Sequence, residues 1–374
     1  MFTMASKSHW LVLCYAGLGL IGLPLIGCYL AGHPIVQYLE FPPRTRYVAH
    51  APFSAWAFFC YTLFILLIIG LLAAGGRRPS EATQKEPAPR HRSFPWWGWT
   101  ALTGCLVFWT LAWSRFLWFA HLQPHTFFPL WLSFIVLINA LCLYRSGRCM
   151  LTHQRAFFVR LFFFSAGFWW FFEYLNRFVQ NWYYTGSEYP PLTYFILATL
   201  SFSTVLPAVL GMRDLLRTFA WVQNRFQVSR PTTAGNTPAF AWSCLVASSA
   251  GLAMIGVWPD LLFPLIWVSP LLVITSLQRI CGHPHIFSPT VHGDWRPVVS
   301  AALAALVCGF FWEMWNFYSL ARWTYSVPLV HRFQMFEMPL LGYAGYLPFG
   351  LECAVVGSLV ESRPTPRSGP PTHN

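Results

Sequence analysis

Hydrophobic residues along this chain gather in long runs that are separated by polar segments. A helix needs roughly 20 predominantly apolar residues to cross the hydrocarbon core of a bilayer. The runs therefore predict ten membrane-spanning helices, although the fourth and eighth are short. They lie near residues 10–32, 51–74, 96–120, 126–144, 156–178, 192–211, 239–258, 261–277, 298–320 and 339–360.

The composition agrees with this pattern. The 374 residues are 56% hydrophobic and only 10% charged, whereas soluble domains carry roughly a quarter charged residues. These values exclude an ordinary soluble domain, a disordered chain and a basic nucleic-acid binder. We expect an all-α, polytopic helical membrane protein that has the membrane and an apolar lipid as partners and binds no nucleic acid; its oligomeric state stays open.

Arginine and lysine indicate the orientation of the predicted spans. Eighteen of the 24 basic residues fall on one side, five fall on the other, and Arg115 lies inside the third span. The positive-inside rule then places both termini in the cytoplasm, and we expect the protein in the bacterial inner membrane. The polar loop 76–93 and the tail 362–374 read as flexible cytoplasmic segments.

An internal repeat is the most informative feature of the sequence. Residues 171–178 and 311–318 share Phe-x-Glu-x-x-Asn at an offset of 140, and the following Trp, Tyr and Pro recur at an offset of 141. We expect two parallel four-helix copies behind two N-terminal helices. The segments are 1–94 with the two helices and a basic linker, 95–230 and 231–361 with the copies, and 362–374 as a disordered tail. A larger bundle without a shared cavity remains the alternative.

Ionisable groups inside a bilayer are costly, so they are candidates for function. The predicted spans contain Glu173, Glu313, Glu352 and Arg115. Loss of solvation favours the neutral form of a buried carboxyl, which could then donate a proton as a general acid. These four residues are the first catalytic candidates.

An asparagine follows each repeated glutamate by three residues, on the same helix face. We expect Asn176 and Asn316 to hold the carboxyls of Glu173 and Glu313. In the alternative interpretation, Glu173 forms a structural ion pair with Arg115 or Arg177.

Glu352 follows a proline and a glycine. Pro348 and Gly350 indicate a broken helix whose freed carbonyls would line a cavity around this carboxyl.

Aromatic residues are unusually frequent, with 35 Phe, 20 Trp and 15 Tyr. Ring faces carry negative charge density and can stabilise a cation that a carboxylate would quench. An acid beside such rings suits protonation of an alkene and steering of the carbocation. We expect most of the aromatic residues to pack against lipid or the membrane interface. The substrate-binding candidates beside the repeated motif are Phe172, Trp312, Trp182, Trp323, Tyr184 and Tyr325.

The sequence carries few motifs typical of cofactor or metal sites. There is no Gly-x-Ser-x-Gly, phosphate loop or Asp-Asp-x-x-Asp, so we expect no cofactor and no metal centre. A cytoplasmic group of Cys281, His283, His285 and His292 lacks a matched second pair of ligands. Whether this group binds a metal stays open.

With its many aromatic spans and buried Glu173 and Glu313, the chain resembles the bacterial tetrahymanol synthases. These polytopic membrane proteins convert a hopene-type triterpene into a ring-expanded alcohol. The resemblance implies a cofactor-independent triterpenoid synthase, isomerase or hydratase. Glu173 or Glu313 would start the reaction, and Glu352 or a water near Tyr325 would end it. The alternatives are a proton-coupled transporter or lipid flippase that uses the same glutamates, and a structural subunit of a larger complex.

Overall fold

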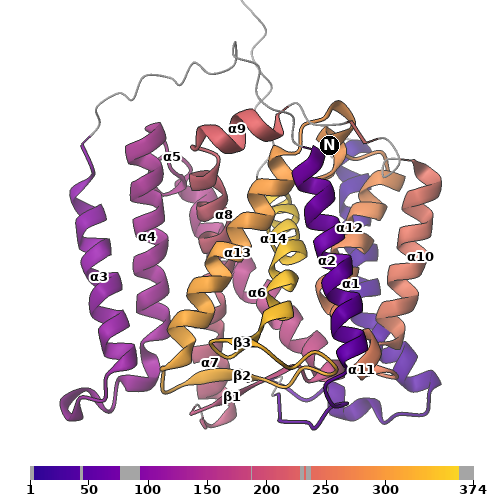
Figure 1. The fold of residues 1–374 in the computed structure, drawn as a ribbon, viewed down its shortest axis with the longest axis horizontal. Helices are drawn as coiled ribbons and strands as arrows, with labels where there is room; N and C mark the ends of the chain where they lie inside the picture. Colours follow the sequence, from indigo (N-terminus) through magenta and orange to yellow (C-terminus); the bar gives the residue numbers. More distant parts are fainter. Residues whose placement is uncertain are drawn as a thin grey trace, which may run out of the picture.

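Helices form one bundle, and the short strands gather at one end of it (Figure 1). The computed structural model describes residues 4–42, 45–75, 93–186, 188–227, 231–232 and 237–361. The predicted tail 362–374 and all but the last residue of the predicted loop 76–93 lie outside this part of the chain.

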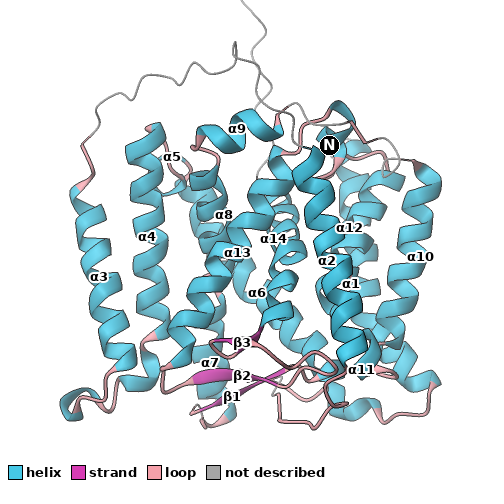
Figure 2. Ribbon diagram, viewed as in Figure 1, coloured by secondary structure: helices cyan, strands magenta, loops and turns pink. Residues whose placement is uncertain are grey.

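The described elements follow the apolar runs of the sequence (Figure 2), and each predicted span overlaps one helix or a helical pair. The helices are α1 Met4–Leu30, α2 Ala55–Gly75, α3 Trp96–Trp113, α4 Phe127–Ser146, α5 Met150–His153, α6 Arg155–Val179, α7 Pro191–Phe202, α8 Val205–Leu216, α9 Ala220–Phe226, α10 Pro238–Met254, α11 Pro259–Leu262, α12 Ser269–Ile280, α13 Arg296–Phe317 and α14 Tyr346–Val360. The strands are β1 Trp182–Thr185, β2 Arg322–Tyr325, β3 Gln334–Met335 and β4 Met338–Pro339, and the short 3₁₀ segments include η6 Phe263–Trp267 and η8 Leu340–Gly345.

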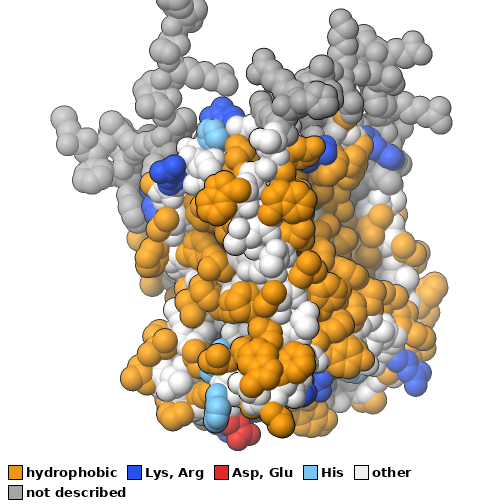
Figure 3. All heavy atoms as spheres, turned by 90° about the vertical axis from the view of Figure 1, so that its left-hand side faces the viewer, with side chains coloured by type: hydrophobic (Ala, Val, Ile, Leu, Met, Phe, Trp, Pro, Cys, Tyr) orange, Lys and Arg blue, Asp and Glu red, His pale blue; other side chains and the backbone are white. Residues whose placement is uncertain are grey.

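Several helices are long and apolar enough to cross a membrane, which confirms a helical, multi-pass membrane protein. Five described segments meet both criteria, and a bent pair would make a sixth. The five are Gln123–Ser146, Arg155–Val179, Pro191–Leu216, Arg296–Phe317 and Leu340–Val360. Figure 3 shows the matching surface, in which hydrophobic side chains cover the middle and charged ones lie toward the two ends. The full set of ten spans stays a prediction.

The helix break lies in a different place from the one predicted. Helix α14 is continuous through Pro348 and Gly350, because Pro348 is in the first turn, where no backbone N–H is needed. Gly350 instead allows close packing, since a Cβ there would overlap the carbonyl oxygen of Ala301 in α13. The bend is between Pro259–Trp267 and Ser269–Ile280, which meet at 52°.

Strands β1 and β2 join segments that are about 140 residues apart. They pair antiparallel, with Trp182 opposite Tyr325, and with Tyr184 opposite Trp323. Trp182 and Trp323 are separated by 141 residues, as are Tyr184 and Tyr325. If each residue of one strand is replaced by its counterpart 141 positions away in the other strand, the same residue pairs are obtained. The two strands are therefore paired as a local two-fold axis would pair them.

Candidate functional site

Glu173 lies on α6 with no exposed surface, and one of its carboxyl oxygens collects hydrogen bonds. Its Oε1 accepts from Trp169 Nε1 at 2.9 Å, one helical turn earlier. It also accepts from Trp182 Nε1 at 3.0 Å and from Tyr184 OH at 2.6 Å. Because β1 follows α6 directly and folds back on it, all three donors come from within 11 residues of the carboxyl.

Glu313 occupies the corresponding place on α13 and is also fully buried. Its Oε1 accepts from Tyr325 OH at 2.7 Å and from Tyr346 OH at 2.6 Å. Trp323 contributes indirectly, since its Nε1 donates to Tyr325 OH at 2.9 Å. The sequence predicts Trp182, Tyr184 and Tyr325 as substrate-binding residues, whereas in the structure they donate hydrogen bonds to the two carboxyls.

The second oxygen of each carboxyl has a different environment. Oε2 of Glu173 and Oε2 of Glu313 are buried and have no hydrogen-bond partner within the described chain. Every donor therefore points at Oε1, which leaves Oε2 as the place for a proton in the neutral acid. Each site can thus present one proton on the side away from its donors.

The phenols of Tyr184 and Tyr325 remain proton donors at ordinary pH. Burial, followed by the nearby carboxyl, raises the pKa of each phenol well above its usual value. Both side chains therefore keep the O–H that bonds Glu173 or Glu313.

The repeated asparagines have a role that differs from the predicted one. Asn176 donates to Trp182 O at 2.8 Å and accepts from Asn181 N at 2.7 Å. Asn316 donates to Trp323 O at 2.8 Å and accepts from Trp323 N at 2.9 Å. Both amides hold the backbone that enters β1 or β2, so they position the aromatic donors rather than the carboxyls.

Neither arginine considered as an ionic partner bonds Glu173. Helix α3 ends at Trp113 because Ser114 is extended, so Arg115 is outside the helix and exposed. It donates to backbone carbonyls, including Tyr318 O at 2.7 Å. Arg177 donates to Gln37 O at 2.9 Å and pairs with Glu40 at 3.8 Å. The predicted catalytic role of Arg115 has no contact to support it.

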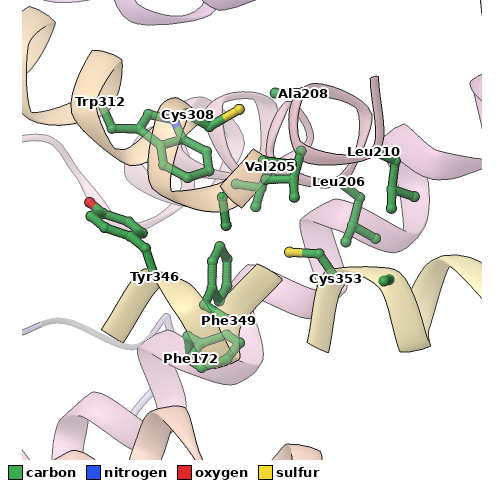
Figure 4. Close-up of a cluster of buried hydrophobic side chains, with 14 of the residues drawn as sticks. Phe172, Val205, Leu206, Ala208, Leu210, Cys308, Trp312, Tyr346, Phe349 and Cys353 are labelled. Atoms are coloured by element: carbon green, nitrogen blue, oxygen red, sulfur yellow. The ribbon is translucent and has the colours of Figure 1, made fainter. Parts of the chain in front are cut away.

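Phe349 on α14 packs between the aromatic residues near Glu173 and those near Glu313. Its ring centroid lies 5.4 Å from that of Phe172, 5.7 Å from Trp169 and 6.3 Å from Trp312. Figure 4 shows Phe349 beside Phe172, with Trp312 and Tyr346 nearby. Phe172 and Trp312, both predicted, are buried in this cluster.

Three residues of the sites were missed by the sequence analysis. Trp169 lies one turn before Glu173, a spacing that could have indicated it. Tyr346 and Phe349 reach the sites from α14, outside the repeated motif. Tyr346 is revealed by the packing of α14 on α13, and Phe349 by its ring contacts with α6 and α13.

Glu352 lies apart from the bonding networks of the other two glutamates. It is 2% exposed, and its Oε1 accepts from Leu271 N at 3.1 Å, at the start of α12. Its Oε2 has no partner among the described residues. Among the described residues, the buried carboxyls of Glu173, Glu313 and Glu352 thus belong to three separate sets of hydrogen bonds.

The described ranges contain no group of three or more His, Cys, Asp and Glu residues placed to hold a metal ion. Cys281 is exposed, close to the end of α12. Comparison of the chain with protein-family models, curated proteins and solved structures gives no match.

Proposed function

We propose that this protein is a membrane enzyme that protonates an apolar isoprenoid or triterpenoid lipid and guides the resulting carbocation. Glu173 and Glu313 are the candidate proton donors. A hopene-type triterpene is the substrate to test first, with a ring-expanded alcohol as its product. The enzyme is a synthase, isomerase or hydratase that uses no cofactor.

One observation supports this proposal above the others: the hydrogen bonding of the two carboxyls is one-sided. The donors at Oε1 stabilise the carboxylate that remains after proton transfer. The proton on Oε2 has no polar acceptor among the described residues. An alkene is an acceptor that suits such a place, because its π electrons take the proton without needing a polar partner.

The remaining steps follow from the surroundings of Glu173 and Glu313. The C–H bond forms as the O–H bond of the glutamate breaks, and the positive charge moves to the adjacent carbon. Ring faces of Phe172 and Trp312 stabilise that charge. Water near Tyr325 then adds to the cation and returns its proton to the carboxylate. The net reaction is alkene plus water to alcohol.

The architecture that we propose has ten spans, arranged as two N-terminal helices and two parallel four-helix copies. The two-fold register of β1 and β2 supports the copies. So do Gly147 and Gly282, which both have a left-handed backbone near the ends of α4 and α12. The basic residues support cytoplasmic termini in a bacterial inner membrane, and α1 begins at the end opposite the strands (Figure 1).

Lipid profiling of a hopanoid-producing host with and without the gene tests the enzyme. We expect a new polycyclic alcohol and less of the hopene precursor. Glu173→Gln and Glu313→Gln keep the size of each side chain but remove the acid. At least one of them should abolish the alcohol, while Glu188→Gln, at an exposed position, should leave it unchanged. An unchanged profile with the wild-type protein inserted would contradict the proposal, as would full product from both glutamate variants.

A proton-coupled transporter or lipid flippase is the second candidate. The two-fold register favours it, because two equivalent copies can rock against each other around a central site. In that case, the purified protein in liposomes should acidify or alkalinise the lumen only when a transported lipid or solute is present. Glu173→Gln and Glu313→Gln should stop the flux.

A further inference from the structure

The third buried carboxyl, that of Glu352, takes no part in the proposed reaction. It is 2% exposed, and none of the salt bridges in the described chain includes it. Its one hydrogen bond comes from the backbone N–H of Leu271. A buried carboxylate without a counter-charge is very costly, so such a group takes up a proton.

The bent segment before α12 adds a second unpartnered group. The preceding residues through Trp267 and the helix from Ser269 meet at 52°. Ser269 is fully buried, and its Oγ has no hydrogen-bond partner within the described residues. It lies two residues before Leu271, which bonds Glu352. The unpaired hydroxyl thus lies in the first turn of α12, and the same turn supplies the backbone N–H that bonds the carboxyl of Glu352 on α14.

Buried polar side chains continue from this point along α12. Leu271, Thr275 and Gln278 lie four and three residues apart, so they share one face of the helix. Thr275 and Gln278 are both buried, and Gln278 Oε1 has no partner in the described ranges. Helix α12 ends at Ile280, and the next residue, Cys281, is exposed. Thr275 and Gln278 thus place buried polar side chains between the turn of α12 that bonds Glu352 and the exposed end of the helix at Cys281.

We propose that Glu352 and Ser269 form a proton-binding site, which exchanges protons with the aqueous side along the Thr275 and Gln278 face of α12. This inference goes beyond the proposed enzyme reaction and does not depend on it. A proton suits the site better than a metal cation, because a metal needs several oxygen ligands, whereas a proton needs only the single carboxyl oxygen of Glu352 that has no partner in the described chain. The described chain also has no cluster of three metal-ligating residues.

Infrared difference spectroscopy of the full-length protein in lipid vesicles tests the site directly. A protonated carboxyl has a C=O stretching band that a carboxylate lacks, and the band shifts when the proton is exchanged for deuterium. We expect the wild-type protein to show one such band that is lost in Glu352→Gln and shifted in Glu352→Asp. The Asp variant keeps the acid in case the amide variant does not fold.

The route is tested by the rate at which this band shifts after transfer into D₂O. Gln278→Leu should slow the shift, whereas Gln334→Leu, at an exposed position of β3, should not. The proposal is overturned if neither Glu352 variant changes the protonated-carboxyl bands, or if both leucine variants exchange at the wild-type rate. Loss of the band when sodium chloride replaces choline chloride would also overturn it, because a metal cation would then hold the site. Failure of Glu173→Gln to alter lipid products would leave these results unaffected.

Discussion

The phenol ring of Tyr346 lies directly against Gly309: a Cβ built on that glycine would be 2.5 Å from the ring carbon Cδ2. Gly309 is one turn before Glu313, the position that Trp169 holds before Glu173. The missing side chain lets α14 bring Tyr346 onto Glu313. Each carboxyl thus has one donor from outside its strand. Glu173 receives it from the indole of Trp169 on its own helix, and Glu313 receives it from the phenol of Tyr346 on the neighbouring helix α14.

Gly309→Ala should lower the free energy of unfolding, because the new methyl group would push Tyr346 off its place. Overpacking of this kind typically costs about 1–3 kcal/mol. Thermal unfolding in detergent micelles measures the loss. Gly167→Ala is the matched control, since no atom lies within 4 Å of a Cβ there, and an alanine in a helix should stabilise slightly. Equal melting temperatures for the two variants would contradict the packing of Tyr346 on Gly309.

Tyr346→Phe should destabilise the protein through Glu313 alone. Removing one donor to a buried polar group costs about 1–3 kcal/mol. Because Trp169 serves the other carboxyl, the cost of Tyr346→Phe combined with Trp169→Phe should equal the sum of the single costs. The double variant of Tyr346→Phe with Glu313→Gln should lose much less stability than the sum of the two single variants, because both changes act on the same hydrogen bond. A double-mutant cycle by denaturant unfolding measures both pairs, and the reverse pattern would contradict the assignment.

Asn176→Leu should loosen the backbone between α6 and β1, at Asn181 and Trp182. The change leaves the backbone N–H of Asn181 and the carbonyl of Trp182 without their amide partner. We expect a loss of about 1–3 kcal/mol and faster amide hydrogen exchange at Asn181. Asn316→Leu should instead speed exchange at Trp323 and leave Asn181 protected. Exchange that changes at both places in both variants would point to general loosening of the fold.

Stability should fall at acidic pH through Asp294, which precedes α13. Burial alone would raise the pKa of this carboxyl, but hydrogen bonds from the Arg296 side chain and backbone outweigh it and lower the pKa below its usual 3.8. A lowered pKa means that the pair stabilises the folded state above pH about 4, and that this contribution is lost as pH falls through the folded value. Asp294→Asn should remove that part of the acid dependence of melting. An identical acid profile in the variant would contradict it.

Much of the fold could be predicted from the sequence, because spanning a bilayer requires long apolar runs. The repeated motif likewise pointed to Glu173, Glu313 and the aromatic residues of the two strands, but not to the hydrogen bonds that join them. Arg115 was misplaced because hydropathy continues past Ser114, where the backbone stops being helical. The helix break was assigned to Pro348, yet a proline in a first turn breaks nothing. Tyr346 could not be found, since its role depends on how closely α14 approaches Gly309.

The pairing of β1 with β2 has a consequence for how such a protein could arise. Because β1 and β2 pair with two-fold symmetry, two copies of one such strand on separate, identical chains could pair in the same register. If the predicted four-helix repeat arose by fusion of two gene copies, its ancestor would have paired as a homodimer through this ribbon, and the fusion would preserve the contact. Under that history the two halves would be free to differ, and the indole at position 169 against the glycine at position 309 is a difference that a symmetric homodimer does not allow.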